Sequence, residues 1–248
     1  MSDFFLQTAD IETGDVIFSS VVSLVSTGIQ LGTNSIWSHV GIAVRLDDSK
    51  KDESAVGEIT WREGQVYILD CSNRPGTDPY TGQKSRMCRF MRLERIINIS
   101  SHVGYRKVNL DRNQTALSKF KQFVLDVINM EWRVSVLRSM APAFSLNMSS
   151  SGSDIDRFTS NIHCAELVGH YIRRLVNPDI KIVPCFLSPA DFSTNPVLDP
   201  AFRQPEALIY RKYYPMWRIL LYPVIIFGIM LGIAILIIYV ITRTIRIR

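Results

Sequence analysis

A long uncharged run near the C-terminus constrains the architecture of this chain more than any other feature. Residues Ile219 to Ile241 include no Asp, Glu, Lys or Arg. As a helix that rises about 1.5 Å per residue, this run is about 35 Å long, and a hydrocarbon core is about 30 Å thick. Basic and aromatic side chains flank the run on both sides, as they do at membrane interfaces. The sequence therefore predicts a transmembrane helix here rather than a buried core helix.

The position of the run predicts a tail anchor. The first residues, Met1 to Gly14, include acids and no apolar stretch of signal-peptide length. Three basic residues lie on each side of the run, so flanking charge does not fix its orientation. We expect a single-pass C-terminal anchor with the body on the cytosolic side of the membrane. The predicted organisation is a body at 1–210, a basic and aromatic juxtamembrane linker at 211–218, a transmembrane helix at 219–241 and a short basic tail at 242–248.

The net charge does not indicate a nucleic-acid-binding protein. The formal charge is +5, but six of the 28 Lys and Arg residues lie from Arg211 onward, where there is no Asp or Glu. Before that point, 22 basic residues face 23 acidic ones. A surface that binds a polyanion needs positive potential on the folded part. We therefore do not expect nucleic acid to be a partner. The expected partner is the lipid bilayer that holds the C-terminal helix.

The four cysteines predict reduced thiols rather than disulfides or a zinc site. They are widely spread, at positions 71, 88, 164 and 185, and no two have the C-x-x-C spacing of zinc ligands. A chain of 248 residues is large enough to bury a hydrophobic core without the support of disulfide bonds. The sequence also lacks a glycine-rich phosphate loop and a metal-ligand cluster. We expect no cofactor and no metal.

Hydrophobic patterning predicts an α+β body. Short strands are predicted at Asp15–Phe18, Trp37–Leu46 and Gln65–Cys71, and Arg89–Ile99 is expected to close the sheet. In the second of these, apolar residues alternate with His39, which points to the other face. Asn73–Gln83 is predicted to be a long loop. Helices are predicted at Val21–Leu31, after the capping residues Asp111 and Asn113, and around Cys164, where Asn161 is the expected N-cap.

Cys164 has the features of a thiol nucleophile. It lies in the first turn of a predicted helix, where free backbone N–H groups and the helix dipole stabilise a thiolate and can hold an oxyanion. His39 is well placed to activate the thiol if its strand packs beside that helix. A buried cysteine at a helix start and a histidine in a strand are also common structural residues, so this pair alone leaves both interpretations open.

Three sequence blocks resemble the circularly permuted NlpC/P60 branch of the papain-like enzymes. They are GDVIF at 14–18, WSHVGI at 37–42 and HCAELV at 163–168, and the family has similar blocks in this order, with histidine ahead of cysteine. SPADF at 188–192 is similar to a segment that follows the cysteine helix in the family. The resemblance covers roughly Glu12 to Phe192. The family includes relatives of lecithin retinol acyltransferase and poxvirus-encoded members.

The resemblance implies a catalytic site of Cys164, His39 and Asp70. Cys164 matches the nucleophile and His39 the base, and Asp70 ends the next predicted strand, where the family has the polar group that orients the imidazole. Asp70 also fits a strand-end cap. His163 and His170 are weaker candidates for the base, because His163 is expected to point elsewhere and His170 lies off the cysteine face. Glu166 is interpreted as structural.

Two classes of function follow. The first is a membrane-anchored cysteine hydrolase or acyltransferase with a permuted papain-like fold, in which an antiparallel sheet packs on the cysteine helix. Its substrate is expected to be an acyl ester or amide, with lipid or N-acyl substrates favoured. The second, which the poxvirus resemblance implies, is a catalytically silent, membrane-anchored structural protein of a large DNA virus. Its body would lie on the virion-internal side of the membrane, with virion shell proteins as partners.

Overall fold

The computed structural model describes residues 2–4, 10–21, 23–45, 66–71, 76–77, 84–85, 88–128 and 162–212, together with 228 and 232. The chain divides into two compact units, Met1–Lys212 and Tyr213–Arg248. Apart from two glycines, the expected transmembrane run at 219–241 lies outside the described residues. No helix among the described residues is long and apolar enough to cross a membrane. The first unit is the folded body.

The body is built on a seven-stranded antiparallel sheet, in agreement with the expected α+β class. The strand order is β1-β9-β8-β2-β3-β4-β7, and β5 and β6 form a separate two-stranded sheet. The strands are β1 (Ser2–Phe4), β2 (Val16–Val21), β3 (His39–Arg45), β4 (Val66–Cys71), β5 (Gly76–Thr77), β6 (Lys84–Ser85), β7 (Cys88–Arg92), β8 (Ser100–Arg106) and β9 (Ala207–Lys212).

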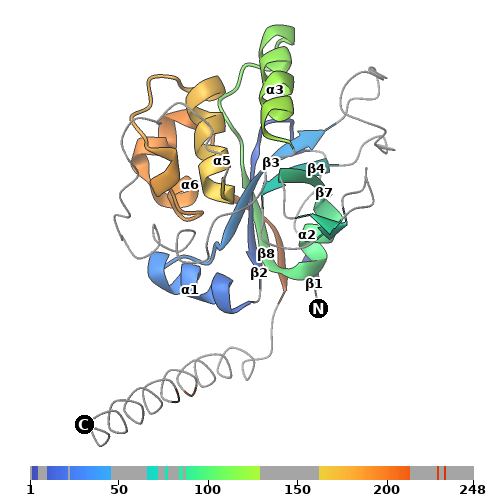
Figure 1. Ribbon diagram of the computed structural model, residues 1–248, viewed down its shortest axis with the longest axis vertical. Helices are drawn as coiled ribbons and strands as arrows, with labels where there is room; N and C mark the ends of the chain where they lie inside the picture. The colour runs from blue at the N-terminus through green and yellow to red at the C-terminus, as the bar shows by residue number, and fades with distance from the viewer. Residues whose placement is uncertain are drawn as a thin grey trace, which may run out of the picture. The chain divides into compact units, whose positions relative to one another are not determined.

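The helices are mostly short and connect or cover the strands (Figure 1). They are α1 (Leu24–Thr33), α2 (Leu93–Ile99), α3 (Gln114–Val127), α5 (Cys164–Tyr171) and α6 (Asp191–Thr194). A π-helical turn, Ile172–Val176, continues α5, and 3-10 turns occur at Pro184–Phe186 and Pro196–Ala201. The Asn113 side chain, one of the two capping residues that the sequence predicted, caps α3 by accepting a hydrogen bond from the N–H of Ala116 at 2.9 Å.

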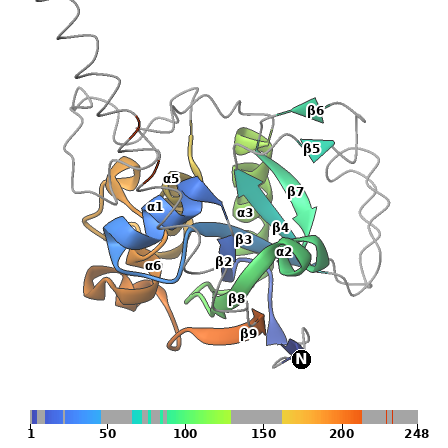
Figure 2. The ribbon, with the colours of Figure 1, turned by 90° about the horizontal axis from the view of Figure 1, so that it is seen from below.

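Each face of the sheet has its own hydrophobic core. Val40 and Ile42 of β3 belong to the core that includes residues of α5 and α3, whereas Ala43 belongs to the core that includes residues of α2. This division follows from the alternation of side chains along a strand. Figures 1 and 2 show α5 against β3 and α2 beside β7 and β8.

The strand registers define two ends of the sheet. Ser19 pairs with His39, so β2 ends where β3 begins. The pairing of β4 with β3 places Cys71 at that end as well, and the pairing of β9 with β8 does the same for Lys212. We call this the His39 end. The other end, where β2 begins and β3 finishes at Arg45, is the Gly14 end.

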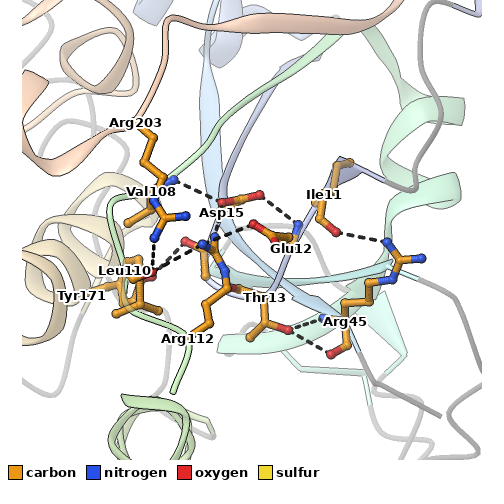
Figure 3. A network of polar contacts seen from close by, with 11 residues as sticks. Ile11, Glu12, Thr13, Asp15, Arg45, Val108, Leu110, Arg112, Tyr171 and Arg203 are labelled. Atoms are coloured by element: carbon orange, nitrogen blue, oxygen red, sulfur yellow. Dashed lines mark hydrogen bonds and ion pairs between the residues drawn. The ribbon is translucent and has the colours of Figure 1, made fainter. Parts of the chain in front are cut away.

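A buried polar network fixes the Gly14 end (Figure 3). Asp15 is fully buried, and its carboxylate accepts hydrogen bonds from the N–H groups of Glu12 at 2.9 Å and Val108 at 3.1 Å. Arg112 pairs with the same carboxylate at 2.6 Å. A buried carboxylate is tolerated only where such partners replace its water. The GD pair of the first sequence block therefore has a structural explanation in this chain.

Four local predictions differ from the structure. Arg89–Ile99 was expected to be one strand, but β7 ends at Arg92 and α2 follows, because Leu93, Ile96 and Ile97 bury one helical face. The expected loop at 73–83 includes β5. The N-cap of the cysteine helix is His163, not Asn161, which lies outside the described residues. In addition, β9 extends to Lys212, into the range expected to be linker.

Candidate active site

His39 and Asp70 meet at the His39 end of the sheet. His39 is the first residue of β3, and Asp70 is the residue before the last in β4, the neighbouring antiparallel strand. The Asp70 Oδ1 atom forms a hydrogen bond and ion pair with the His39 Nε2 atom. The Asp70 side chain is only 2% exposed and that of His39 is 18% exposed. Because Nε2 is engaged by Asp70, Nδ1 is the ring nitrogen left to face another group.

Cys164, on helix α5, lies at the same end of the sheet as His39 and Asp70. It is the first residue of α5, it is half-buried, and α5 packs directly on β3. The side chains of Cys164 and His39 are close enough for each to shift the pKa of the other. The structure therefore brings together the three residues to which the sequence assigned catalytic roles, from two adjacent strands and one helix.

The electrostatics of the cluster favour a thiolate facing an imidazolium. Burial alone raises the pKa of the Cys164 thiol, but the neighbouring His39 and His163 side chains outweigh burial and lower that pKa to about 6. Burial alone lowers the pKa of His39, but the charges of Asp70 and Cys164 raise it to about 10. Each partner stabilises the charged form of the other. Both shifts therefore favour the thiolate–imidazolium ion pair over the neutral pair.

His163 forms part of the site, although the sequence analysis expected it to point elsewhere. Its Nδ1 atom accepts a hydrogen bond from the N–H of Glu166 at 3.3 Å, and the Glu166 carboxylate accepts one from the N–H of His163 at 3.4 Å. This is a capping box with histidine in the place of serine or threonine. Burial alone lowers the pKa of His163, but the adjacent Cys164 and Glu166 side chains raise it. Both capping side chains are buried.

The capping box determines which backbone donors stay available beside the thiol. The first four N–H groups of a helix have no partner within it, and they belong here to His163, Cys164, Ala165 and Glu166. The box uses the first and the last of these. The N–H groups of Cys164 and Ala165 are left at the positive end of the helix dipole, next to the sulfur. A negative oxygen that develops at the sulfur is stabilised by such donors.

Cys71 and Cys88 have a different environment from Cys164. They are paired across β4 and β7 and are buried in the core. The Cys71 thiol donates a hydrogen bond to the carbonyl oxygen of Ile162 at 3.1 Å, and burial raises its pKa well above the ordinary value. These two thiols are therefore structural. Within the described ranges, no group of three or more His, Cys, Asp or Glu side chains could hold a metal ion.

Comparisons with known proteins give a likeness in fold only. No family model and no curated protein matches this sequence. Among solved structures, the chain is similar to metalloprotein yiiX from Escherichia coli O157:H7. The identity is 17%, the match covers 82% of this chain and 98% of that chain, and the TM-score is 0.46.

Proposed function

We propose that this chain is a membrane-anchored cysteine hydrolase or acyltransferase. Cys164 is the nucleophile, His39 is the general base and acid, and Asp70 is the positioning residue for His39. The observation that carries the proposal is the hydrogen bond between His39 and the buried Asp70, formed beside a half-buried thiol at a helix N-terminus. A purely capping role for Asp70 would not require an imidazole held against that thiol.

The acylation step uses the ion pair. The Cys164 thiolate attacks the acyl carbonyl carbon, and the oxygen takes up the negative charge beside the N–H groups of Cys164 and Ala165. The imidazolium of His39 then gives its Nδ1 proton to the leaving oxygen or nitrogen, and the bond from the carbonyl carbon to the leaving group breaks. The products are a thioester on Cys164, a neutral His39 and the released alcohol or amine.

Deacylation reverses the proton flow. Neutral His39 takes a proton from water, or from an acceptor alcohol or amine, as that group attacks the thioester carbonyl. The carbon–sulfur bond breaks, and the thiolate–imidazolium pair is restored. Asp70 keeps Nε2 protonated throughout and stabilises the imidazolium, so that Nδ1 is the nitrogen that exchanges protons. Water gives a hydrolase and an acceptor gives a transferase.

The proposed substrates are lipid esters and N-acyl amides. The uncharged run at 219–241 is long enough to anchor the chain in a bilayer, and a tethered enzyme meets membrane acyl groups at high effective concentration. The proposed location is therefore the membrane surface, with the body on the cytosolic or virion-internal side.

A thioester on Cys164 is the decisive intermediate. The full chain, in detergent or vesicles, is mixed with a short p-nitrophenyl ester, quenched in acid and analysed by intact-protein and peptide mass spectrometry. We expect one acyl group on Cys164 in the wild type and none in Cys164→Ala. Cys185→Ala is the matched control, because Cys185 is also half-buried, and it should be acylated like the wild type.

The result that overturns the proposal is a chain that stays unacylated, or that is acylated equally well after His39→Ala. A folded chain with no thioester on Cys164 fits the alternative, a membrane-anchored structural protein that keeps this fold without turnover.

A further inference from the structure

Helix α1 exposes apolar side chains and carries no charge. In the described chain, Leu31 is the most exposed large hydrophobic residue at 73%, and Ile36 follows closely in sequence at 48%. Val25 is 37% exposed. Single exposed hydrophobic residues are ordinary, but these three lie within twelve residues. No Asp, Glu, Lys or Arg occurs in the 29 residues from Val16 to Val44.

The exposed positions belong to one broad side of α1. With 100° of rotation per residue, Val25 and Leu31 are separated by about 120° around the helix, and Gly28 lies between them. The opposite side faces the body, where Ser26 and Ile29 are buried. A surface helix normally carries charged residues on its exposed side. This exposed side has none, which removes the main cost of contact with an apolar medium.

Topology places α1 at the same end of the sheet as the candidate active site. α1 connects the end of β2 at Val21 to the start of β3 at His39, so it joins the two strands at the His39 end. In Figure 1, α1 and α3 lie at opposite ends of the body. The exposed residues of α1 therefore belong to the same end of the body as the candidate active site.

The chain also leaves the body at this end. β9 finishes at Lys212, and the register of β9 with β8 puts that residue at the His39 end. Only six residues, 213–218, separate Lys212 from the start of the uncharged run at Ile219. Six residues span at most about 20 Å. If the run is in a bilayer, the His39 end of the body is held within about that distance of the membrane surface.

We propose that the exposed side of α1, with the turn that ends at Ile36, is a bilayer-docking surface. Val25, Leu31 and Ile36 insert among the lipid headgroups and upper acyl chains, and the body is held with its His39 end toward the membrane. This inference rests on the proposed function, which it extends by naming the surface through which a lipid acyl group reaches Cys164. We expect this surface to contact the bilayer rather than another protein, because the short segment 213–218 connects this end of the body to the proposed membrane helix.

Photo-crosslinking at position 31 tests the contact directly. The full chain with Leu31→p-benzoylphenylalanine is reconstituted in phosphatidylcholine nanodiscs, irradiated and analysed by mass spectrometry. The matched control carries the same replacement at Leu125 of α3, which is 43% exposed. We expect phosphatidylcholine adducts at position 31 and none at position 125. Crosslinks between two protein chains at position 31, or no adduct in a nanodisc-inserted chain, overturn the proposal.

Turnover gives a second, functional test. For Leu31→Glu and the control Leu125→Glu, we compare the rate on a vesicle-embedded lipid ester with the rate on a short soluble ester. We expect the ratio of the two rates to fall about tenfold for Leu31→Glu, because a carboxylate must be desolvated to enter the interface. The ratio should be unchanged for Leu125→Glu.

Thioester formation in the wild type and the rate ratio of Leu31→Glu together distinguish a failure of the docking surface from a failure of the proposed function. A wild type that never forms the Cys164 thioester rejects the proposed function. A wild type that turns over, together with an unchanged ratio in Leu31→Glu, rejects the docking surface alone. If Leu31→Glu does not fold, the crosslinking result decides.

Discussion

The hydroxyl of Tyr171 donates a hydrogen bond to the carbonyl oxygen of Gly14 at 2.9 Å. Tyr171 is the last residue of α5 and Cys164 is the first. The contact therefore ties the far end of the nucleophile's helix to the turn that begins β2, at the Gly14 end of the sheet. The other end of the helix meets His39. The position of the thiol relative to the imidazole depends on both attachments.

Removal of the Tyr171 hydroxyl should loosen α5 at modest cost. We expect Tyr171→Phe to lower the free energy of unfolding by about 1–2 kcal/mol, because the buried Gly14 carbonyl loses its donor. Chemical denaturation measures this change. Leu125→Ala, at an exposed position of α3, is the reference, with an expected loss below about 1 kcal/mol. A loss in Tyr171→Phe no larger than in this reference would mean that the hydrogen bond does not hold the helix.

Gly14 should not tolerate a side chain. Its φ is +94°, a conformation that costs L-residues energy, and an added Cβ would lie 2.5 Å from the Tyr171 hydroxyl oxygen. We expect Gly14→Ala to destabilise the body more than Tyr171→Phe does. In the double variant, the loss should be smaller than the sum, since the Phe side chain removes the clashing atom. Additive losses would contradict the geometry.

The pH dependence of thiol alkylation should reveal the ion pair. Because the pKa of Cys164 is lowered to about 6, its thiolate persists down to that pH and is lost below it. We expect the iodoacetamide rate at Cys164 to rise with a midpoint near pH 6 and to shift toward the ordinary thiol range in His39→Gln. Faster alkylation of Cys71, Cys88 or Cys185 at pH 6 in the folded chain would rule out the assignment of the nucleophile.

Asp70→Asn should lower turnover without unfolding the protein, and so test whether Asp70 positions the His39 imidazole. The amide can still bond to His39, but it supplies no charge to raise the pKa of the imidazole and allows the wrong tautomer. We expect turnover to fall by up to about 10⁴-fold, as for the corresponding Asp→Asn change in serine proteases, with little loss of stability. A lower His39 pKa, followed by NMR titration of the ring, is the signature that a purely structural Asp70 would not give.

Asp15 and Glu12 both pair with Arg112, but they should contribute differently to the free energy of unfolding. Asp15→Ala leaves the N–H groups of Glu12 and Val108 without their acceptor, and we expect a loss of about 3 kcal/mol. Glu12 also pairs with Arg112, at 3.2 Å, but its side chain is 46% exposed. Glu12→Ala should therefore cost less than about 1 kcal/mol. Similar losses in denaturant titrations would contradict this division.

The sequence predicted the parts of the site that depend on local pattern. The alternation predicted His39 inside a strand at Trp37–Leu46, whereas β3 begins at His39 itself. The predicted strand Gln65–Cys71 placed Asp70 near a strand end, as in β4. Periods of three and four residues predicted α5 with Cys164 in its first turn. These signals lie within single elements, so they can be interpreted without knowledge of the fold.

Elements that depend on distant partners were not predictable in the same way. β8 is a central strand, yet its sequence is SSHVGYR, and its buried Arg106 is accommodated by the Phe192 carbonyl and by Asp199. Nothing near Arg106 in the sequence indicates those partners. The switch from strand to helix at Leu93 was also missed, since an isoleucine-rich segment suits both structures until its burial is known.

His163 could have been recognised from its spacing. His163 and Glu166 have the i, i+3 relation of a capping box, but histidine is not among the usual N-cap residues. This unusual cap gives the last prediction, because histidine combines two roles at this position. It caps α5 through Nδ1, and it lowers the pKa of Cys164.

Two variants should separate these roles. His163→Ser restores a conventional capping box with Glu166, whereas His163→Ala removes the cap and should cost about 1 kcal/mol of stability. Both variants remove the imidazole next to the sulfur, so both should move the midpoint of Cys164 alkylation upward from about pH 6. A midpoint that rises only in His163→Ala would mean that the helix terminus, and not the imidazole, lowers the thiol pKa. A midpoint that rises equally in both variants, with stability lost only in His163→Ala, establishes the electrostatic role of His163 independently of its cap.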